Sequence, residues 1–327
     1  MIIPRPTETS TQLEINKYLT FPGMLSYLAG IWIINLNYWG CNQYITQRAL
    51  GADLQTARTG ILFAGFLKLL MPVIVMLPGI AAFVLYENGH LPQLVGGKDG
   101  AYSAVLTFLP TGLKGLSVAA LTAAIVASLA GKVNSISTIY TLDVHKKYIQ
   151  KDATDRSQVN IGRYAVFAAM LLAVLFTWND VLGIGGVGGF TYIQKYTGFI
   201  SPGVFAMFIL GMFWKRTTGT AAIVGVISGF LLSVLFNEFA PALFGNETLL
   251  YTAWPNGNGG YEIPFHICMG LSFVFTMLLM IAVSFAGPKV NPKAFELDSE
   301  MFKIKPQTTV MIVITLLIIF ALYAKFW

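Results

Sequence analysis

The chain has 327 residues, of which 55% are hydrophobic and only 11% are charged. Soluble proteins carry about 25% charged residues, so this composition excludes a soluble globular protein, and its hydrophobicity excludes a disordered one. The formal net charge is +6, and in a membrane protein such a basic excess usually lies in cytoplasmic loops. Cys41 and Cys268 both stand in apolar runs, which favours two buried thiols over a disulfide or a metal site.

Long apolar stretches dominate the chain. A transmembrane helix takes about 20 apolar residues, and eight stretches satisfy this length. The sequence therefore predicts an all-α, polytopic membrane protein of about eight transmembrane helices. We place these helices near residues 22–48, 61–86, 113–142, 160–179, 189–213, 219–239, 263–286 and 308–327.

The distribution of basic residues predicts the orientation. Thirteen of the 21 Lys and Arg residues stand in the loops after the first, third, fifth and seventh helices, and five stand in the loops and tails of the other side. Because basic residues concentrate in cytoplasmic loops, we expect a multi-pass protein of the cell (inner) membrane with both termini outside. Residues 1–21 are polar and have no signal-peptide core, which predicts an external polar tail.

The first helix carries a polar and aromatic face. Asn35, Tyr38, Trp39 and Asn42 have the spacing i, i+3, i+4 and i+7, so one helical face would present them all. Amides and the rims of aromatic rings suit a sugar, which has an apolar face and many hydroxyls. The alternative is a contact between helices joined by amides. Gly40 would loosen the helix here, and broken helices mark transporter sites.

The second helix carries a lysine inside the membrane. Lys68 lies eight residues from the cytoplasmic end of the predicted helix, which is roughly 12 Å at the rise of an α-helix. A lysine at the centre of a membrane helix costs about 2.5–3.5 kcal/mol. Two interpretations remain open: the side chain extends to the inner interface, or it faces an aqueous cavity and donates hydrogen bonds to a polar solute.

The third helix is rich in Ala, Gly and Ser, and most of these residues favour close helix packing. Ser128 lies near mid-membrane, one turn after Ala124. A hydroxyl beside a partly free carbonyl is a suitable ligand pair for a small hard cation such as sodium. At the cytoplasmic end, Asp143 and His145 form the one His–carboxylate pair, which favours a solvated helix end over the active site of a membrane enzyme.

The fifth helix follows a glycine-rich segment, DVLGIGGVGGF (180–190). Gln194 lies near its beginning and Ser201-Pro202-Gly203 lies in its middle. A proline inside a helix frees a carbonyl and bends the axis. If the helix bends inward, Gln194 reaches a central solute. Otherwise its amide caps the helix or takes part in helix packing.

Five segments, taken together, resemble one protein family. They are NLNYWGCNQYITQRAL (35–50), FAGFLKLLMPVIVMLPGIAA (63–82), ALTAAIVASLAGKVNS (120–135), TYIQKYTGFISPG (191–203) and GMFWKRTTGTAAIVG (211–225). In this order they resemble the sodium:solute symporter family, in particular its bacterial sodium/galactose members. The resemblance extends over essentially the whole chain.

The resemblance implies a role for individual residues. Asn35, Lys68 and Gln194 match sugar hydrogen-bonding positions of the family. Tyr38 matches the ring that stacks beneath the sugar and closes the inner gate, with Trp39 as its neighbour in the gate. Ala124 and Ser128 match sodium ligands, whereas Ala127 stands where the family pattern has a second serine, which removes one possible sodium oxygen.

The resemblance also implies that this chain corresponds to only part of the family's fold. The family has a LeuT-type core of two inverted five-helix repeats with flanking helices. Residues 22–213 match the second repeat and residues 214–327 match three peripheral transmembrane helices, while the first repeat is missing. We therefore expect a fragment, a truncated gene product or one part of a split transporter, whose partner is the missing repeat in the same or a separate chain.

The function implied is sodium-coupled secondary active transport of a galactose- or glucose-like sugar, with sodium as the coupling ion and no enzymatic activity. One alternative is a sodium-coupled carrier of another solute, such as myo-inositol, sialic acid or proline. Another is a membrane subunit that does not itself transport. The lipid bilayer, the sugar and sodium are the expected partners, and nucleic acid is not.

Overall fold

The structure of the chain is a computed structural model that describes residues 3–7, 9–91, 100–178, 189–240 and 252–326. Its internal contacts divide the chain into two compact units. Unit 1 comprises Met1–Thr46 and Phe190–Trp327, and unit 2 comprises Gln47–Gly189. Each unit is described by itself.

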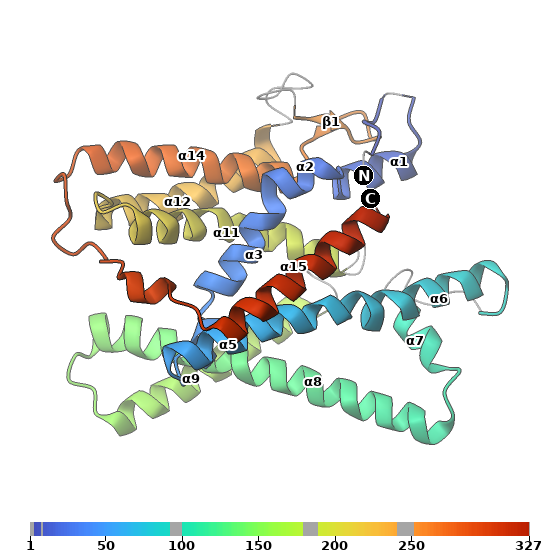
Figure 1. Ribbon diagram of the computed structural model, residues 1–327, viewed down its shortest axis with the longest axis horizontal. Coiled ribbons are helices and arrows are strands. Elements are labelled where there is room, and N and C mark those ends of the chain that lie inside the picture. The colour runs from blue at the N-terminus through green and yellow to red at the C-terminus, as the bar shows by residue number, and fades with distance from the viewer. Residues whose placement is uncertain (1–2, 8, 92–99, 179–188, 241–251, 327) are drawn as a thin grey trace. The chain divides into compact units, whose positions relative to one another are not determined.

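Helices dominate both units (Figure 1), and eight of them are long and apolar enough to cross a membrane. This confirms the predicted all-α, polytopic fold class. Within the described residues, one two-stranded sheet accompanies the helices. The division into a tail at 1–21, a repeat at 22–213 and peripheral helices at 214–327 stays a prediction. The eight spans are Gln12–Cys41, Leu54–Glu87, Thr111–Ile149, Asp155–Thr177, Thr191–Phe213, Gly219–Phe239, Phe265–Phe285 and Pro306–Lys325.

Unit 1 contains the first span and the last four. Its elements are α1 (Gln12–Thr20), α2 (Met24–Ser26), η1 (Tyr27–Ile31), α3 (Trp32–Leu36), η2 (Asn37–Cys41), α11 (Gly189–Phe213), α12 (Gly219–Val234), η8 (Leu235–Phe239), β1 (Trp254–Pro255), β2 (Tyr261–Glu262), α14 (Phe265–Phe285), η11 (Ser299–Phe302) and α15 (Pro306–Phe326). The boundary with unit 2 falls within α4 (Gln43–Ala49).

Unit 2 contains the second, third and fourth spans. Its elements are α5 (Leu54–Leu67), η3 (Lys68–Leu70), η4 (Pro72–Met76), α6 (Leu77–Glu87), α7 (Ala101–Leu106), α8 (Thr111–Thr138), η6 (Ile139–Ile149) and α9 (Asp155–Thr177). The helices α8 and α9 pack against each other. At their contact, a Cβ on Gly162 of α9 would collide with Ser137 Oγ of α8, so glycine permits the close approach.

The first span differs from its prediction at both ends. A helix over 22–48 was expected, whereas helical structure begins at Gln12 and the backbone is extended at Asn42 (φ −82°, ψ 119°). The early start has a local cause, since Thr11 and Glu14 form a capping box: Thr11 N donates to Glu14 Oε2 at 2.9 Å, and Glu14 N donates to Thr11 Oγ1 at 3.4 Å. The polar tail is therefore partly helical.

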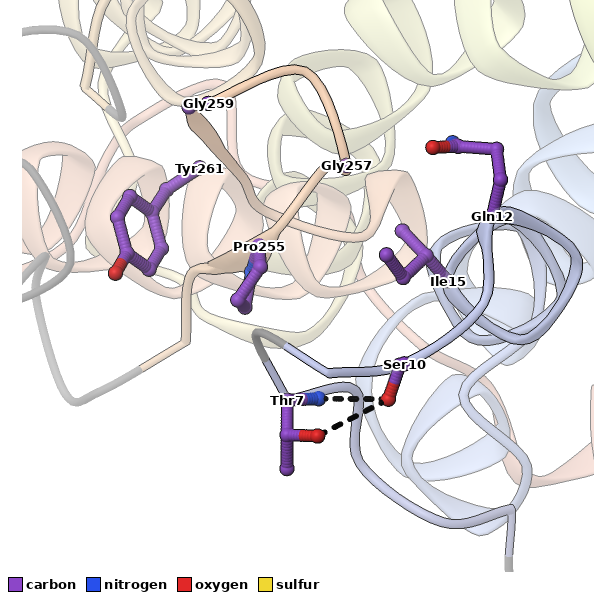
Figure 2. Close-up of a pocket in the computed structure, with 9 residues that line it drawn as sticks. Thr7, Ser10, Gln12, Ile15, Pro255, Gly257, Gly259 and Tyr261 are labelled. Carbon is purple, nitrogen blue, oxygen red and sulfur yellow. Dashed lines mark hydrogen bonds between the residues drawn. The ribbon is translucent and has the colours of Figure 1, made fainter.

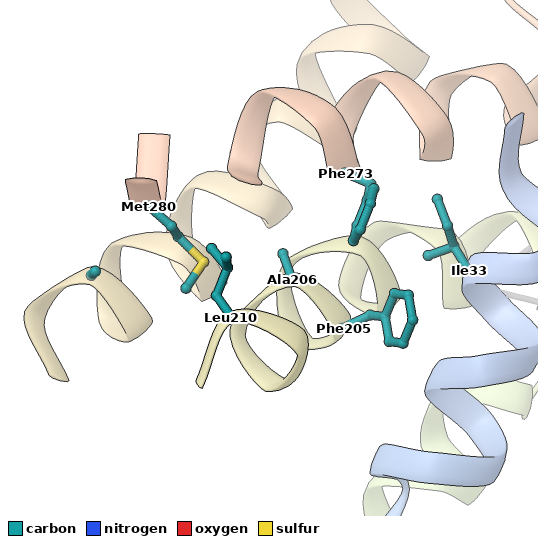
Figure 3. Close-up of a cluster of buried hydrophobic side chains, with 7 residues drawn as sticks. Ile33, Phe205, Ala206, Leu210, Phe273 and Met280 are labelled. Atoms are coloured by element: carbon teal, nitrogen blue, oxygen red, sulfur yellow. The ribbon is translucent and has the colours of Figure 1, made fainter. Parts of the chain in front are cut away.

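The core of unit 1 forms where α3, α11 and α14 meet. Figure 3 shows Ile33, Phe205 and Phe273 directed toward one another from these three helices. The Trp32 ring lies edge-on to both phenylalanines, with centroid distances of 5.8 Å to Phe205 and 5.3 Å to Phe273. Such aromatic pairs contribute about 0.5–1.5 kcal/mol beyond the area they bury. Ala206, Leu210, Ala221 and Met280 complete the cluster.

Glycines bring the backbones of α11 and α12 into direct contact. A Cβ on Gly203 would lie 2.9 Å from Gly225 O and 3.2 Å from Gly229 Cα. Small residues recur every fourth position along the contact face of α12, at Ala221, Gly225, Gly229 and Ser233, and all four are buried. Because lipid is as apolar as leucine, close packing of this kind is a main force joining membrane helices. The helices α12 and α14 lie side by side in the same unit (Figure 1).

The contact between α11 and α12 predicts a contrast between two glycine substitutions. Gly229→Ala would place a Cβ 2.8 Å from Gly203 N, whereas a Cβ on Gly211 of α11 has no neighbour within 4 Å. We expect Gly229→Ala to destabilise the protein by about 1–3 kcal/mol through overpacking. Gly211→Ala should leave stability unchanged or raise it slightly, because alanine favours a helix more than glycine does. The measurement is the midpoint of thermal unfolding of the purified protein in detergent, and equal midpoints for the two variants would contradict the packing described.

Candidate functional site

The first span is interrupted at the polar face that the sequence predicts. The segment η2 is a π-helix, and its last residue is followed by the extended Asn42. Asn42 Oδ1 accepts a hydrogen bond from Tyr44 N at 3.0 Å, which caps α4. The prediction that Asn42 shares a helical face with Asn35 and Tyr38 is therefore wrong, because Asn42 is outside the helix.

Tyr38 and Trp39 form a pair just before this break. Their rings are edge-on at 5.8 Å between centroids, and Tyr38 is 40% exposed. Asn35, one turn earlier, is exposed and donates from Nδ2 to Ile31 O at 2.8 Å. A solute bound at Asn35 would therefore compete with a bond inside the helix for this donor, while an exposed aromatic ring lies one turn away.

Gln194 lies near the beginning of α11 and is half-buried. The same part of the helix carries an aromatic row, with ring centroids 4.4 Å apart for Tyr192 and Tyr196 and 5.3 Å apart for Tyr196 and Phe199. Lys195 Nζ lies 3.5 Å from Glu238 Oε1 of η8. The glycine-rich segment expected to lead into this helix lies mostly at 180–188, outside the described residues.

One polar contact in unit 1 was not predicted from the sequence. Asn37 Nδ2 donates to Ser201 Oγ at 3.2 Å, and Ser201 Oγ donates to Thr197 O at 2.9 Å. This joins the broken first span to α11 at the residue before Pro202. The Ser-Pro-Gly sequence was a signal for an irregular helix, but the identity of the partner depends on tertiary structure.

Lys68 of unit 2 lies where the second span changes its helical form. The α-helix α5 ends at Leu67, Lys68 begins a short 3₁₀ helix, and a π-helix follows from Pro72. Pro72 has no N–H, so the carbonyl of Lys68 accepts a hydrogen bond from Met71 N–H in the 3₁₀ pattern instead of the usual α-helical one. The Lys68 side chain is exposed. The residue therefore combines a cationic side chain with a locally irregular backbone.

The predicted sodium ligands lie on a regular helix. Ala124, Ala127 and Ser128 are exposed residues of α8, which is α-helical from Thr111 to Thr138. Their spacing places them on one face. Within a regular helix the carbonyl of Ala124 accepts the N–H of Ser128, and its second lone pair remains available to a cation. No group of three or more His, Cys, Asp or Glu side chains able to hold a metal occurs in the part of the chain that is described.

The His–carboxylate pair at the end of the third span is not arranged as a catalytic pair. His145 is buried and its Nε2 lies 3.4 Å from Gln150 Oε1, whereas Asp143 is exposed. The predicted solvated helix end therefore holds for the exposed Asp143 but is wrong for His145, which packs inside η6.

The predicted site residues are divided between the two units. Asn35, Tyr38, Trp39 and Gln194 belong to unit 1, and Lys68, Ala124, Ala127 and Ser128 belong to unit 2. Tyr38 and Trp39 are in contact with each other, and the three α8 residues share a face. The convergence of both groups on one chamber stays a prediction.

A further cavity lies in unit 1, between the N-terminal segment and the hairpin of β1 and β2. It has a volume of about 420 Å³ and is lined by hydroxyl, amide and glycine backbone groups from Thr7, Ser10, Gln12, Gly257, Gly259 and Tyr261, among others (Figure 2). The two segments are joined by Gln12 Nε2, which donates to Asn256 O at 3.2 Å, and by the Arg5 guanidinium, 5.1 Å from the Trp254 ring centroid. No pattern in the sequence predicts this cavity.

A multi-span helical protein with an interrupted helix that carries amide and aromatic side chains has the features of a transporter. Comparison with known families agrees, since residues 2–229 match the sodium:solute symporter family. The chain belongs to this family.

Three relatives illustrate the similarity. The chain is 38% identical to the sodium/glucose cotransporter of Vibrio parahaemolyticus over 95% of its own length and 56% of that relative. It is 38% identical to the mouse sodium/myo-inositol cotransporter 2 over 66% of the chain and 33% of the relative. It is 35% identical to the bovine sodium/myo-inositol cotransporter over 63% of the chain and 30% of the relative. The chain thus spans about half the length of the bacterial relative. The family and these relatives are described as symporters and cotransporters, not as enzymes.

Proposed function

We propose that the complete protein containing this chain couples the entry of sodium to the uptake of a glucose- or galactose-like sugar across the cell membrane. The observation that carries this proposal is the 38% identity to the Vibrio sodium/glucose cotransporter over 95% of the chain. The interrupted first span supports it, because it presents an exposed tyrosine ring at Tyr38 and an exposed amide at Asn35 next to the break in the helix.

Four side chains form the proposed sugar site: Asn35, Tyr38, Lys68 and Gln194. The ring of Tyr38 offers an apolar surface to the C–H face of the sugar. The amides of Asn35 and Gln194 donate to and accept from hydroxyls, and the ammonium of Lys68 donates to hydroxyl oxygens. Tyr38 and Trp39, in edge-on contact, form the inner gate, which must open before the sugar leaves.

Sodium is the proposed coupling ion, and it binds to the carbonyl of Ala124 and the hydroxyl of Ser128. Neutral oxygens suit this hard monovalent cation. Two ligands from one helix are too few for tight binding, so further oxygens come from the missing first repeat, in the same full-length chain or in a separate chain. Ala127 supplies none, which lowers the affinity for sodium relative to a site with a second serine.

Coupling follows from differential affinity for two conformations. Bound sodium favours the outward-open conformation, which binds sugar, and loss of sodium to the cytoplasm favours the conformation that releases it. Each sodium charge that crosses the membrane contributes about 2.3 kcal/mol per 100 mV. We propose the orientation that the basic residues predict, in which the loops after the odd-numbered spans are cytoplasmic and both chain ends are outside.

A second candidate substrate is a cyclic polyol such as myo-inositol, which the 38% identity to the mouse sodium/myo-inositol cotransporter 2 favours. The same ring and amides suit either solute, since both present hydroxyls around a six-membered ring. Competition between labelled glucose and unlabelled myo-inositol during uptake distinguishes the two.

The first prediction from this proposal concerns the driving ion. The complete protein, reconstituted in proteoliposomes, should accumulate labelled glucose or galactose when an inward sodium gradient is imposed, because sodium favours the sugar-binding conformation. Equal concentrations of potassium should not support accumulation. Uptake that ignores sodium and follows an imposed proton gradient would overturn the ion assignment.

The second prediction concerns Lys68. Lys68→Ala removes a charged hydrogen-bond donor, and such bonds contribute about 1.5–3 kcal/mol, so the KM for sugar should rise more than tenfold. Lys114→Ala removes an exposed lysine from the first turn of α8 in the same unit and should leave the KM unchanged. A wild-type KM in Lys68→Ala would exclude this lysine from the sugar site.

The third prediction concerns Ala127. Ala127→Ser adds a hydroxyl oxygen on the same face of α8 as Ala124 and Ser128, so the sodium concentration for half-maximal uptake should fall by about threefold, as expected when a cation gains an oxygen ligand. Ala119→Ser is the matched control, since it lies two turns away and is rotated by about 80° around the helix. If both substitutions have the same effect, the hydroxyl at position 127 does not reach the ion.

A further inference from the structure

The helix α11 has a discontinuity in its backbone hydrogen bonds at Pro202. Proline has no N–H, so the carbonyl of Gly198, four residues earlier, lacks its ordinary helical partner. Ser201, Pro202 and Gly203 are all buried. In the membrane an unsatisfied carbonyl costs free energy, and the helix is free to bend at this point unless neighbouring elements hold it.

Two neighbouring elements donate hydrogen bonds at this point. Ser233 Oγ of α12 donates to Gly198 O at 3.4 Å, which gives the freed carbonyl a partner. Asn37 Nδ2 of η2 donates to Ser201 Oγ at 3.2 Å. Ser201 and Ser233 are 2% and 1% exposed, so water does not replace either bond. We call Asn37, Ser201 and Ser233 the Pro202 clamp.

Packing immediately after Pro202 fixes the second half of α11 independently of the clamp. Gly203 contacts the backbone of Gly225 and Gly229, and Phe205 lies among Trp32 and Phe273. The clamp, by contrast, contacts residues on the N-terminal side of the proline. The first half also has contacts of its own, since Gly198 packs against Met269, Phe199 lies near Phe230, and Lys195 pairs with Glu238. The clamp supplies the hydrogen bonds nearest to Pro202 and fixes the direction of this half together with those contacts.

Asn37 has a feature that packing alone does not explain. Its Oδ1 is buried and has no hydrogen-bond partner among the described residues. An unsatisfied buried oxygen is destabilising, so an apolar side chain of similar size would pack at lower cost in free energy. The asparagine gains from its Nδ2 donor, whose partner is Ser201.

Gln194 lies in the half of α11 that the clamp directs. It precedes Ser201 by seven residues, which is two helical turns, so both side chains lie on nearly the same face, about 10 Å apart along the axis. Asn37 also adjoins Tyr38 in sequence. One hydrogen bond therefore connects the segment that carries the proposed gate to the helix that carries the proposed sugar amide.

We propose that Asn37, Ser201 and Ser233 are positioning residues for sugar binding, which hold α11 at Pro202 so that Gln194 keeps its place relative to Tyr38. The role of these three residues in sugar binding rests on the proposed function. Their mechanical role, which is to hold α11 in place at Pro202, does not. Loss of the clamp should let the first half of α11 move while the second half stays in place.

The mechanical part is tested by cysteine labelling, which needs no transport. Reporter cysteines are introduced by Gln194→Cys, before Pro202, or by Met212→Cys, after it; Met212 is 42% exposed. Cys41 is replaced by alanine, and the fully buried Cys268 is kept. In the complete protein in detergent, Asn37→Ala and Ser201→Ala should each change the maleimide labelling rate at position 194 by at least threefold and leave position 212 unchanged.

Ser272→Ala is the matched control. It removes a hydroxyl from another fully buried serine of unit 1, on α14, whose Oγ has no hydrogen-bond partner in the described structure. This variant should leave both labelling rates unchanged. Unchanged rates at position 194 in the clamp variants, or equal changes at positions 194 and 212, would overturn the clamp.

The role in transport is tested separately, by uptake. Asn37→Ala and Ser201→Ala, with Gln194 intact, should raise the KM for sugar by about threefold to tenfold, the effect of losing one hydrogen bond, and leave the maximal rate and the half-saturating sodium concentration unchanged. A reduced maximal rate with an unchanged KM would show that the clamp serves stability rather than sugar binding. The labelling result stands whether or not the wild-type protein takes up sugar, so failure of the proposed function and failure of the clamp are distinguishable.

Discussion

In a bilayer every backbone N–H and C=O must find a partner inside the protein. This constraint explains why a polar side chain accompanies each interruption of a helix described in unit 1. The first span ends its helix at Asn42, where the asparagine side chain caps the helix that follows. Within α11, the carbonyl freed by Pro202 accepts a hydrogen bond from Ser233. Each interruption is thus accompanied by a polar side chain that limits its cost, and both lie close to residues of the proposed sugar site.

The same constraint explains why glycines are concentrated around α11 and α12. A side chain can reach a carbonyl of the neighbouring helix only if the two backbones are close, and Gly203, Gly225 and Gly229 permit that distance. The next residue at this spacing on α12 is Ser233, which donates to α11. Close packing and hydrogen bonding at Pro202 are therefore two consequences of one four-residue pattern of small side chains.

The sequence predicted the parts of the structure that depend on local or average properties. Composition and apolar runs were sufficient for the eight helical spans, because span length is set by the thickness of the bilayer. The end of the first helix was predicted wrongly, since a helical face through Asn42 looks the same in sequence whether or not that residue turns out of the helix. The hydrogen bond from Asn37 to Ser201 joins residues 164 positions apart, and no periodic pattern identifies such a partner. For Asn35, Lys68 and Gln194 the residue chemistry left two interpretations open, the family resemblance favoured the sugar site, and their roles stay predictions.

The spans differ in how much of their apolar surface the described residues cover. In the most apolar part of each span, the buried share is 39% for Gln12–Cys41 and 44% for Thr191–Phe213, but 6% for Leu54–Glu87 and Pro306–Lys325 and 0% for Thr111–Ile149. An exposed apolar helix is stable in lipid, yet Ala124 and Ser128 would then present sodium-binding oxygens to hydrocarbon, which is unfavourable for a cation. A functional sodium site on α8 therefore requires other protein segments to cover this face. The chain spans 56% of the Vibrio relative, which supports the proposal that further sodium ligands come from protein segments outside this chain.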